Sequence, residues 1–147
     1  MKEKIKFAFA VSHSNNFEVL HFGEVDKYLI YEWNGNEIIF TNEIINEFKL
    51  LNEKQEHGSK MKGELIIDML KKNDIKVLVS KQFGPNVKMV NEFFIPVIIY
   101  NDTTGDVIRA LKRHIFWIQD ELNNRPKEFK LFTIKQGILK TPISDKK

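Results

Sequence analysis

The sequence predicts one α/β domain built on a mixed five-stranded sheet. Three observations lead to this prediction: a length of 147 residues, an Asn34-Gly35 turn between two strand-like segments, and a change from alternating to helical spacing of apolar residues after residue 58. This length is typical of one domain and lets the chain bury about two thirds of the surface that it exposes when unfolded. The patterns predict strands first and then helices that alternate with strands.

The first half of the chain carries the strand signals. Residues 5–11 begin with alternating polarity and become continuously apolar, which predicts a strand that is buried at its end. A long polar connection follows over 12–26. Residues 27–33 and 37–44 are rich in aromatic and β-branched residues, and the Asn-Gly pair between them is a strong hairpin signal. We therefore expect one strand, a long loop and an antiparallel hairpin.

The second half of the chain alternates helical and extended signals. Apolar residues at helical spacing predict helices over 59–73, 85–94 and 104–123, the second opened by a Gly-Pro pair and the third by adjacent threonines. Between these helices, 75–79 and 96–100 are apolar runs of strand length. We therefore expect helices that cover the sheet between its later strands.

The order of elements predicts how the sheet is assembled. Right-handed crossovers between the parallel strands give the sheet order 3-2-1-4-5, with strand 2 antiparallel to the others. This is a ribonuclease H-like arrangement flanked by α-helices. We assign residues 1–124 to this domain and residues 125–147 to a basic C-terminal extension.

Positive charge is concentrated in the extension. The formal charge of the chain is +3, whereas residues 125–147 contain seven basic and two acidic residues and carry +5. A basic end on a near-neutral body indicates either an acidic partner or a solvated tail. Five apolar residues in it favour packing on the body or on a second copy of the chain: Leu131, Phe132, Ile134, Ile138 and Leu139.

The composition excludes several classes of protein. The chain has no cysteine, so it has neither disulfides nor thiolate-held zinc or iron–sulfur sites. The first residues are too charged for a signal peptide and no apolar run is long enough for a membrane span, so we expect a cytoplasmic protein. The sequence has no Walker lysine loop, dinucleotide-binding glycine motif or Gly-x-Ser-x-Gly elbow. The first strand carries no carboxylate, which excludes a two-metal nuclease of the ribonuclease H kind.

Topology predicts a binding site at the edge where the parallel strands end. The connections that emerge there are 12–26, 47–58, 80–85 and 101–104. Three of the four histidines lie in these connections and are candidate metal ligands: His13, His21 and His57. Helices also begin there, near Ser59, Pro85 and Thr104, and their N–H groups suit an anion. Asp102 and Asp106 are more simply a turn residue and a first-turn helix acid than paired catalytic carboxylates.

Short motifs at this edge resemble those of a known family. His21-Phe22-Gly23 follows the long connection, Phe83-Gly84-Pro85-Asn86 follows the fourth strand, and a Thr-led helix follows the fifth. With the order of elements over residues 5–123, the chain resembles the dinitrogenase iron–molybdenum cofactor biosynthesis family. The resemblance implies a non-catalytic, nitrogen fixation-related protein that transiently binds and carries an iron–sulfur or iron–molybdenum cofactor or its precursor. The implied cofactor-binding residues are His21, Phe22, Gly23, Gly84 and Pro85.

The chain also departs from the family pattern. Glu24-Val25 stands where a basic and a small residue are common, and Lys81-Gln82-Phe83 replaces a stretch usually richer in glycine. Two other functions therefore stay open: a scaffold that holds a protein partner through the basic extension, and a binder of a small phosphorylated molecule. For a metallocluster carrier, we expect His21 to be the main ligand, aided by His13 or His57 and by the backbone around Gly84. We expect neither nucleic acid nor a membrane as a partner.

Overall fold

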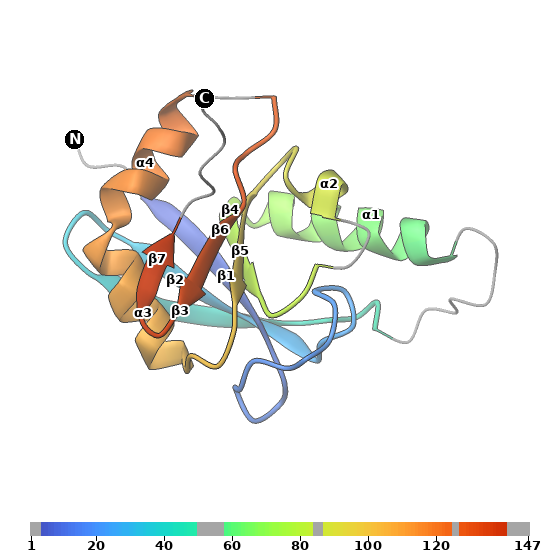
Figure 1. Cartoon of the computed structure of the whole chain (residues 1–147). Coiled ribbons are helices and arrows are strands. Elements are labelled where there is room, and N and C mark those ends of the chain that lie inside the picture. Colours follow the sequence, from blue (N-terminus) through green and yellow to red (C-terminus); the bar gives the residue numbers. More distant parts are fainter. Residues whose placement is uncertain (1–3, 50–57, 84–86, 125–126, 141–147) are drawn as a thin grey trace.

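The computed structural model describes residues 4–49, 58–83, 87–124 and 127–140 (Figure 1). Its sheet has the strand order β3-β2-β1-β4-β5-β6-β7. The strands are β1 (Ile5–Val11), β2 (Lys27–Trp33), β3 (Ile38–Ile45), β4 (Ile75–Ser80), β5 (Ile95–Ile99), β6 (Phe132–Lys135) and β7 (Ile138–Lys140). The helices are α1 (Gly58–Lys72), α2 (Val87–Val90), α3 (Thr104–Arg113) and α4 (Ile115–Asn124).

The sheet is mixed, with β1 in its interior. β1 pairs antiparallel with β2 and parallel with β4, β2 pairs antiparallel with β3, and β4 pairs parallel with β5. The predicted order 3-2-1-4-5 is confirmed, and so is the direction of strand 2. The predicted number of five strands is wrong, because β6 pairs parallel with the outer edge of β5 and β7 returns beside β6.

Helices cover both faces of the sheet, as Figure 1 shows. Alternate residues of β1 point to opposite faces, so both faces receive apolar side chains. Phe7 and Phe9 belong to the core beneath α3 and α4, which contribute residues such as Leu111 and Ile118. Ala8 belongs to the second core, beneath α1 and α2, where residues such as Ile66, Leu70 and Val90 are buried. Ala10 and the fully buried Tyr28 also belong to this second core.

The helices differ from the predicted ranges at two places. The predicted helix 85–94 is wrong in length: the described α2 covers four residues, and the chain then turns with the Phe93 and Phe94 N–H groups both donating to the Val90 carbonyl. The predicted helix 104–123 is interrupted at His114, whose φ of −115° and ψ of 29° end α3. Among the described helices, none has both the length and the apolar character needed to cross a bilayer.

The extension after residue 124 joins the sheet through a tight hairpin. Gln136 and Gly137 have positive φ values of 52° and 76° and connect β6 to β7, as expected for a two-residue turn whose twist suits the flanking strands. Phe132, Ile134 and Leu139 are at most 3% exposed. The predicted packing of the extension on the body is therefore confirmed for these three, whereas Ile138 is exposed.

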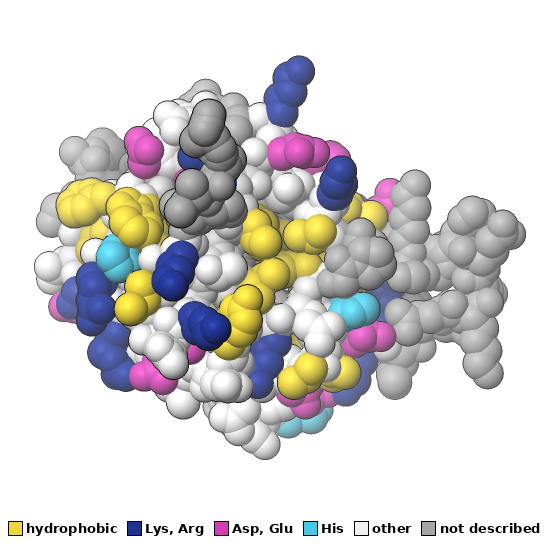
Figure 2. Space-filling view, viewed as in Figure 1, with side chains coloured by type: hydrophobic (Ala, Val, Ile, Leu, Met, Phe, Trp, Pro, Cys, Tyr) yellow, Lys and Arg dark blue, Asp and Glu magenta, His cyan; other side chains and the backbone are white. Residues whose placement is uncertain are grey.

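Part of the surface is apolar. Figure 2 shows hydrophobic side chains on the visible face, interleaved with basic ones. The large apolar residues that stay exposed include residues of the edge strand β3 and two consecutive aromatic residues at the start of α4: Ile39, Phe40, Ile45, Phe116 and Trp117.

Candidate functional site

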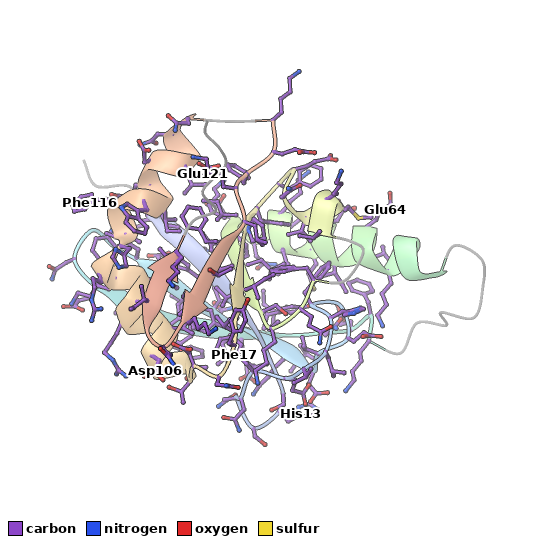
Figure 3. The ribbon with its side chains drawn as sticks, in the orientation of Figure 1. His13, Phe17, Glu64, Asp106, Phe116 and Glu121 are labelled. Atoms are coloured by element: carbon purple, nitrogen blue, oxygen red, sulfur yellow. The ribbon has the colours of Figure 1, made fainter. Side chains whose placement is uncertain are left out.

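The predicted binding edge is formed by the carboxyl ends of the strands that run parallel to β1. The pairings give β3, β4, β5 and β6 the same direction as β1. The connection 12–26, the chain after β3, the segment 81–83 and the connection 100–103 therefore leave the sheet at this edge, together with the β6–β7 turn. Figure 3 shows His13 and Asp106 at this end of the molecule.

The His21-Phe22-Gly23 motif is held at this edge by its backbone. The Phe22 N–H donates to the Gln82 carbonyl at 3.0 Å, and His21 forms an isolated parallel bridge with Gln82. The Phe22 carbonyl accepts a hydrogen bond of 2.5 Å from the hydroxyl of Tyr28. The Phe22 side chain is buried with its ring centroid 5.9 Å from that of Phe83. The residue after His21 is thus fixed on both sides, and the motif has a structural role.

Burial also affects the hydroxyl of Tyr28. This side chain is among the largest that are fully buried, and its burial raises the pKa of the phenol above its ordinary value of 10.0. The hydroxyl therefore stays protonated and acts as a donor toward the Phe22 carbonyl.

The return of the loop toward β2 is held by Asn46. Its Nδ2 donates to the carbonyls of Gly23 at 3.0 Å and Val25 at 2.8 Å. A side chain on Gly23 would place its Cβ 3.2 Å from the Cδ1 of Ile66, which is tighter than an ordinary contact. Glycine at position 23 therefore lets the loop approach α1 closely.

The imidazole of His21 faces solvent. Its side chain is 42% exposed, and its Nδ1 lies 3.8 Å from Oε1 of Glu24. This distance is an ionic contact and is too long for a direct hydrogen bond. Glu24 therefore places a carboxylate on the Nδ1 side of the ring, and Nε2 is the nitrogen farther from this acid.

His13 lies on the same edge but is attached to a different acid. Its side chain is 76% exposed, and Nε2 of the imidazole lies 3.8 Å from Oδ1 of Asp26. The backbone N–H of His13 donates to Oδ2 of the same carboxylate at 3.0 Å. The Lys49 Nζ also hydrogen-bonds Asp26 and, with the His13 N–H, lowers the pKa of this carboxyl. Asp26 therefore links the start of the connection to the chain after β3.

The described part of the chain contains no group of three histidine, aspartate or glutamate side chains placed to share one metal ion. His13 and His21 are each paired with an acid of their own. The other predicted site residues, His57, Gly84 and Pro85, lie outside the described residues. The described residues therefore offer single imidazoles and backbone groups, and no closed metal cage.

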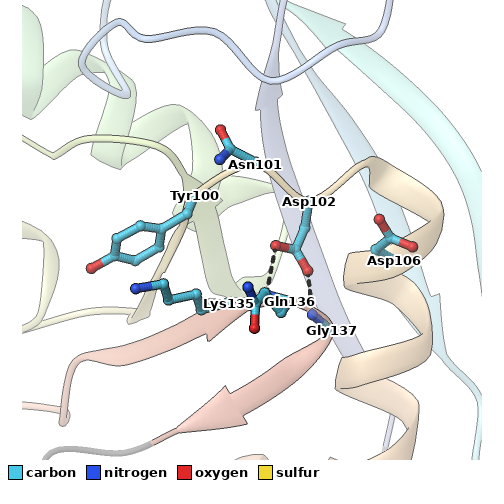
Figure 4. Close-up of a pocket in the computed structure, with 7 residues that line it drawn as sticks. All are labelled: Tyr100, Asn101, Asp102, Asp106, Lys135, Gln136 and Gly137. Atoms are coloured by element: carbon cyan, nitrogen blue, oxygen red, sulfur yellow. Dashed lines mark hydrogen bonds between the residues drawn. The ribbon is translucent and has the colours of Figure 1, made fainter.

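A hollow of about 550 Å³ opens at the carboxyl ends of β5 and β6 (Figure 4). It is lined by Tyr100, Asn101, Asp102, Asp106, Lys135, Gln136 and Gly137. The carboxylate of Asp102 accepts the Gln136 N–H at 3.1 Å and the Gly137 N–H at 2.6 Å. The sequence interpretation of Asp102 as a turn residue missed these two bonds, because both donors lie more than 30 positions away in the chain.

Asp106 is the first-turn acid that the sequence predicts. It forms a capping box with Thr103: the Asp106 N–H donates to Thr103 Oγ1 and the Thr103 N–H donates to Asp106 Oδ2. These bonds, with Arg109 nearby, lower the pKa of Asp106. The N-terminus of α3 is therefore capped by its own residues, which weakens the prediction of an anion site there.

A search of curated proteins gave no match. A family model described as dinitrogenase iron-molybdenum cofactor matches residues 3–114. The match begins just before β1, includes the connection 12–26 with His21, and ends at His114, which separates α3 from α4. Since it spans more than half of the 147 residues, the chain belongs to the dinitrogenase iron–molybdenum cofactor family.

Proposed function

We propose that the protein binds and carries an iron–sulfur or iron–molybdenum-type cofactor, or its precursor, in the cytoplasm and performs no chemistry on it. The cargo would rest on the loops at the carboxyl edge of a ribonuclease H-like domain, with His21 as its main protein ligand. Family membership supports a role in handling this cofactor. The observation that carries the proposal is a half-exposed His21 imidazole on a backbone fixed by Gln82 and Tyr28.

The contact between His21 and Glu24 supports a ligating Nε2. A metal ligand must present a lone pair, and Nε2, the ring nitrogen farther from the Glu24 carboxylate, would supply it. Glu24, at which this chain departs from the family pattern, would then serve to orient the His21 ring. Lys81, next to the Gln82 that bridges to His21, adds a positive charge near a cargo that is itself anionic.

Few protein ligands suit a carrier. A closed tetrahedral site of four side chains holds a metal firmly and is typical of structural sites. In this proposal the protein supplies the His21 imidazole, a second imidazole from His13 or His57, and backbone contacts around Gly84. Most coordination positions of the metal are then filled by the cofactor's own ligands or stay open to those of a recipient protein. In this proposal Phe22 and Gly23 shape the loop, and they do not contact the metal.

The test is anaerobic reconstitution of the full chain with iron and sulfide, followed by metal analysis and titration with Fe²⁺. We expect the wild type to bind iron and to absorb in the visible range. His21→Ala should lower the affinity for Fe²⁺ at least about tenfold, because an anchoring ligand is lost. His13→Ala and His57→Ala should each have a smaller effect, and Glu24→Gln should weaken binding without abolishing it.

His114→Ala is the matched control, because His114 lies between α3 and α4 and outside the loops of the carboxyl edge. It should bind Fe²⁺ as the wild type does. Circular dichroism must show that each variant is folded. A folded His21→Ala that binds as tightly as the wild type would exclude His21 as a ligand, and a wild type that takes up no iron would exclude the carrier function.

A further inference from the structure

The hollow at the carboxyl ends of β5 and β6 is formed by two parts of the chain. One wall comes from the segment 100–106, within the residues that the family model matches, and the other comes from residues 135–137 of the hairpin beyond that match. Its volume of about 550 Å³ lies in the range usual for small-molecule sites. The hairpin therefore gives this chain a hollow that the family-matched part alone would not enclose.

The strand register places Lys135 beside Tyr100. β5 and β6 pair in parallel with Ile98 opposite Thr133, and the next residues along the same face are Tyr100 and Lys135. The Lys135 Nζ lies 5.4 Å from the centroid of the Tyr100 ring, a distance at which a cation is attracted by the ring. Both side chains are exposed. A positive charge and an aromatic surface therefore lie side by side in the hollow (Figure 4).

The charges of the other lining residues are already compensated. Asp102 accepts both N–H groups of the β6–β7 turn. Asp106 accepts the Thr103 N–H and pairs with Arg109. Lys135 forms no ion pair among the described residues. Its ammonium is thus the uncompensated charge of the hollow, and it favours one negative charge on a ligand.

Three neutral polar groups also line the hollow. They are the hydroxyl of Tyr100 and the side-chain amides of Asn101 and Gln136, and none of them has a hydrogen-bond partner within the part of the chain that the structure describes. An amide offers both donors and an acceptor, and a tyrosine hydroxyl can do either. A few polar groups of this kind beside an apolar surface are what orients a small ligand.

We propose that this hollow binds a planar aromatic monocarboxylate. The carboxylate would pair with the Lys135 ammonium, and the ring would lie against Tyr100, since aromatic rings attract one another at contact distance. Polar substituents on the ring would bond to the amides of Asn101 and Gln136. A phosphate group would instead bring nearly two negative charges to one lysine, in a hollow that already holds two carboxylates. The proposal needs no metal, so it does not depend on the carrier function.

Another hollow, of about 300 Å³, lies at the amino ends of β1 and β4 and is less suited to an anion. The Nζ of Lys4 lies 4.0 Å from Glu32, and the Nζ of Lys76 lies 3.3 Å from Asp74. Its lysines are therefore each close to an acid, unlike Lys135. The residues of this second hollow serve as an internal reference for non-specific binding.

The test is titration of the isotope-labelled full chain, without iron, with para-hydroxybenzoate, followed by amide NMR spectra. We expect shifts centred on residues 100–106 and 135–137 and a dissociation constant of about 1 mM, as suits a ligand of this size held by one cation and one ring. Benzamidine has a similar planar shape and the opposite charge, and it should bind at least about tenfold more weakly. Phenyl phosphate should also bind more weakly than the carboxylate.

Substitutions at the two main contacts locate the site. Lys135→Gln should weaken binding at least about fivefold, and Lys135→Arg should stay within about twofold of the wild type, because it keeps the charge. Tyr100→Leu should weaken binding at least about threefold, because it removes the ring and keeps an apolar side chain. Lys140→Gln is the matched control: it makes the same change of charge on the same hairpin, at an exposed residue that does not line the hollow. It should bind as the wild type does.

Two results would overturn the site: lining residues that do not shift with para-hydroxybenzoate, or a folded Lys135→Gln that binds as tightly as the wild type. An equal loss of binding in Lys140→Gln would also overturn it, since the general charge of the hairpin would then suffice. Benzamidine or phenyl phosphate that binds as tightly as the carboxylate would overturn the ligand class. Because the substituted side chains are exposed, these variants should fold, and the amide spectra check this.

Discussion

Replacing Asp102 with alanine would break the connection between the end of β5 and the C-terminal hairpin. Asp102 is 7% exposed, and its carboxylate accepts the N–H groups of both turn residues, Gln136 and Gly137. No other side chain among the described residues accepts these two N–H groups. The variant would therefore leave two donors of a tight turn without a protein acceptor.

The expected loss follows from these two bonds. A hydrogen bond to a charged group contributes about 1.5 to 3 kcal/mol, and water at the partly buried turn recovers part of it, so we expect Asp102→Ala to lower the free energy of unfolding by about 3 kcal/mol. For a chain of this size, that corresponds to a decrease of roughly 6 to 12 °C in the melting temperature. Asp102→Asn keeps one acceptor oxygen and should lose about half as much.

Urea denaturation followed by circular dichroism measures both variants. Asp68→Ala is the control: it removes an exposed carboxylate from α1 and should change the unfolding free energy by no more than about 0.5 kcal/mol. A loss of less than about 1 kcal/mol for Asp102→Ala would refute the reasoning, because the hairpin would then be held by its apolar contacts alone.

Two further predictions concern stability. The hydrogen bonds from Thr103 keep the pKa of Asp106 below its ordinary value of 3.8 in the folded state. The ionised Asp106 carboxylate therefore contributes its full stabilisation at pH values above 3.8. This stabilisation is lost as the pH falls through the lower pKa of the folded state. Thermal melts from about pH 5 to about pH 2 should show a shallower decline for Asp106→Asn than for the wild type, and equal slopes would contradict this. Truncation after Asn124 removes the buried side chains of Phe132, Ile134 and Leu139 and should lower the melting temperature by at least about 5 °C, whereas an unchanged melt would mean that the hairpin is dispensable.

Local signals were sufficient for most of the sheet. The Asn34-Gly35 turn and the alternation on either side of it specify the β2–β3 hairpin, because turn chemistry and side-chain period act over a few residues. The order 3-2-1-4-5 followed from crossover handedness, which also needs no long-range information. The additional strands were missed because β6 is selected by the open edge of β5 and by Asp102, both far away in the sequence.

The candidate site was predicted in position more than in detail. Strand direction alone placed His13 and His21 at one edge of the sheet. The acids beside them, Asp26 and Glu24, could not be deduced from spacing. Asp26 is 13 residues away from His13 in the sequence, and the contact between His21 and Glu24 depends on how the loop turns. The sequence places Tyr28 in a strand but does not predict the hydrogen bond from its hydroxyl to the Phe22 carbonyl. The burial of this hydroxyl depends on the packing of the whole core.

The fixed backbone at Phe22 has a consequence for rates. Its N–H is bound to Gln82 and its carbonyl to Tyr28, so the peptide groups on either side of Phe22 cannot turn away without breaking a hydrogen bond each. For a cargo held on His21 as proposed, departure would then proceed by exchange of ligands at the metal. The release rate should rise with the concentration of a competing imidazole or thiol, and a recipient protein would accelerate it by supplying that ligand.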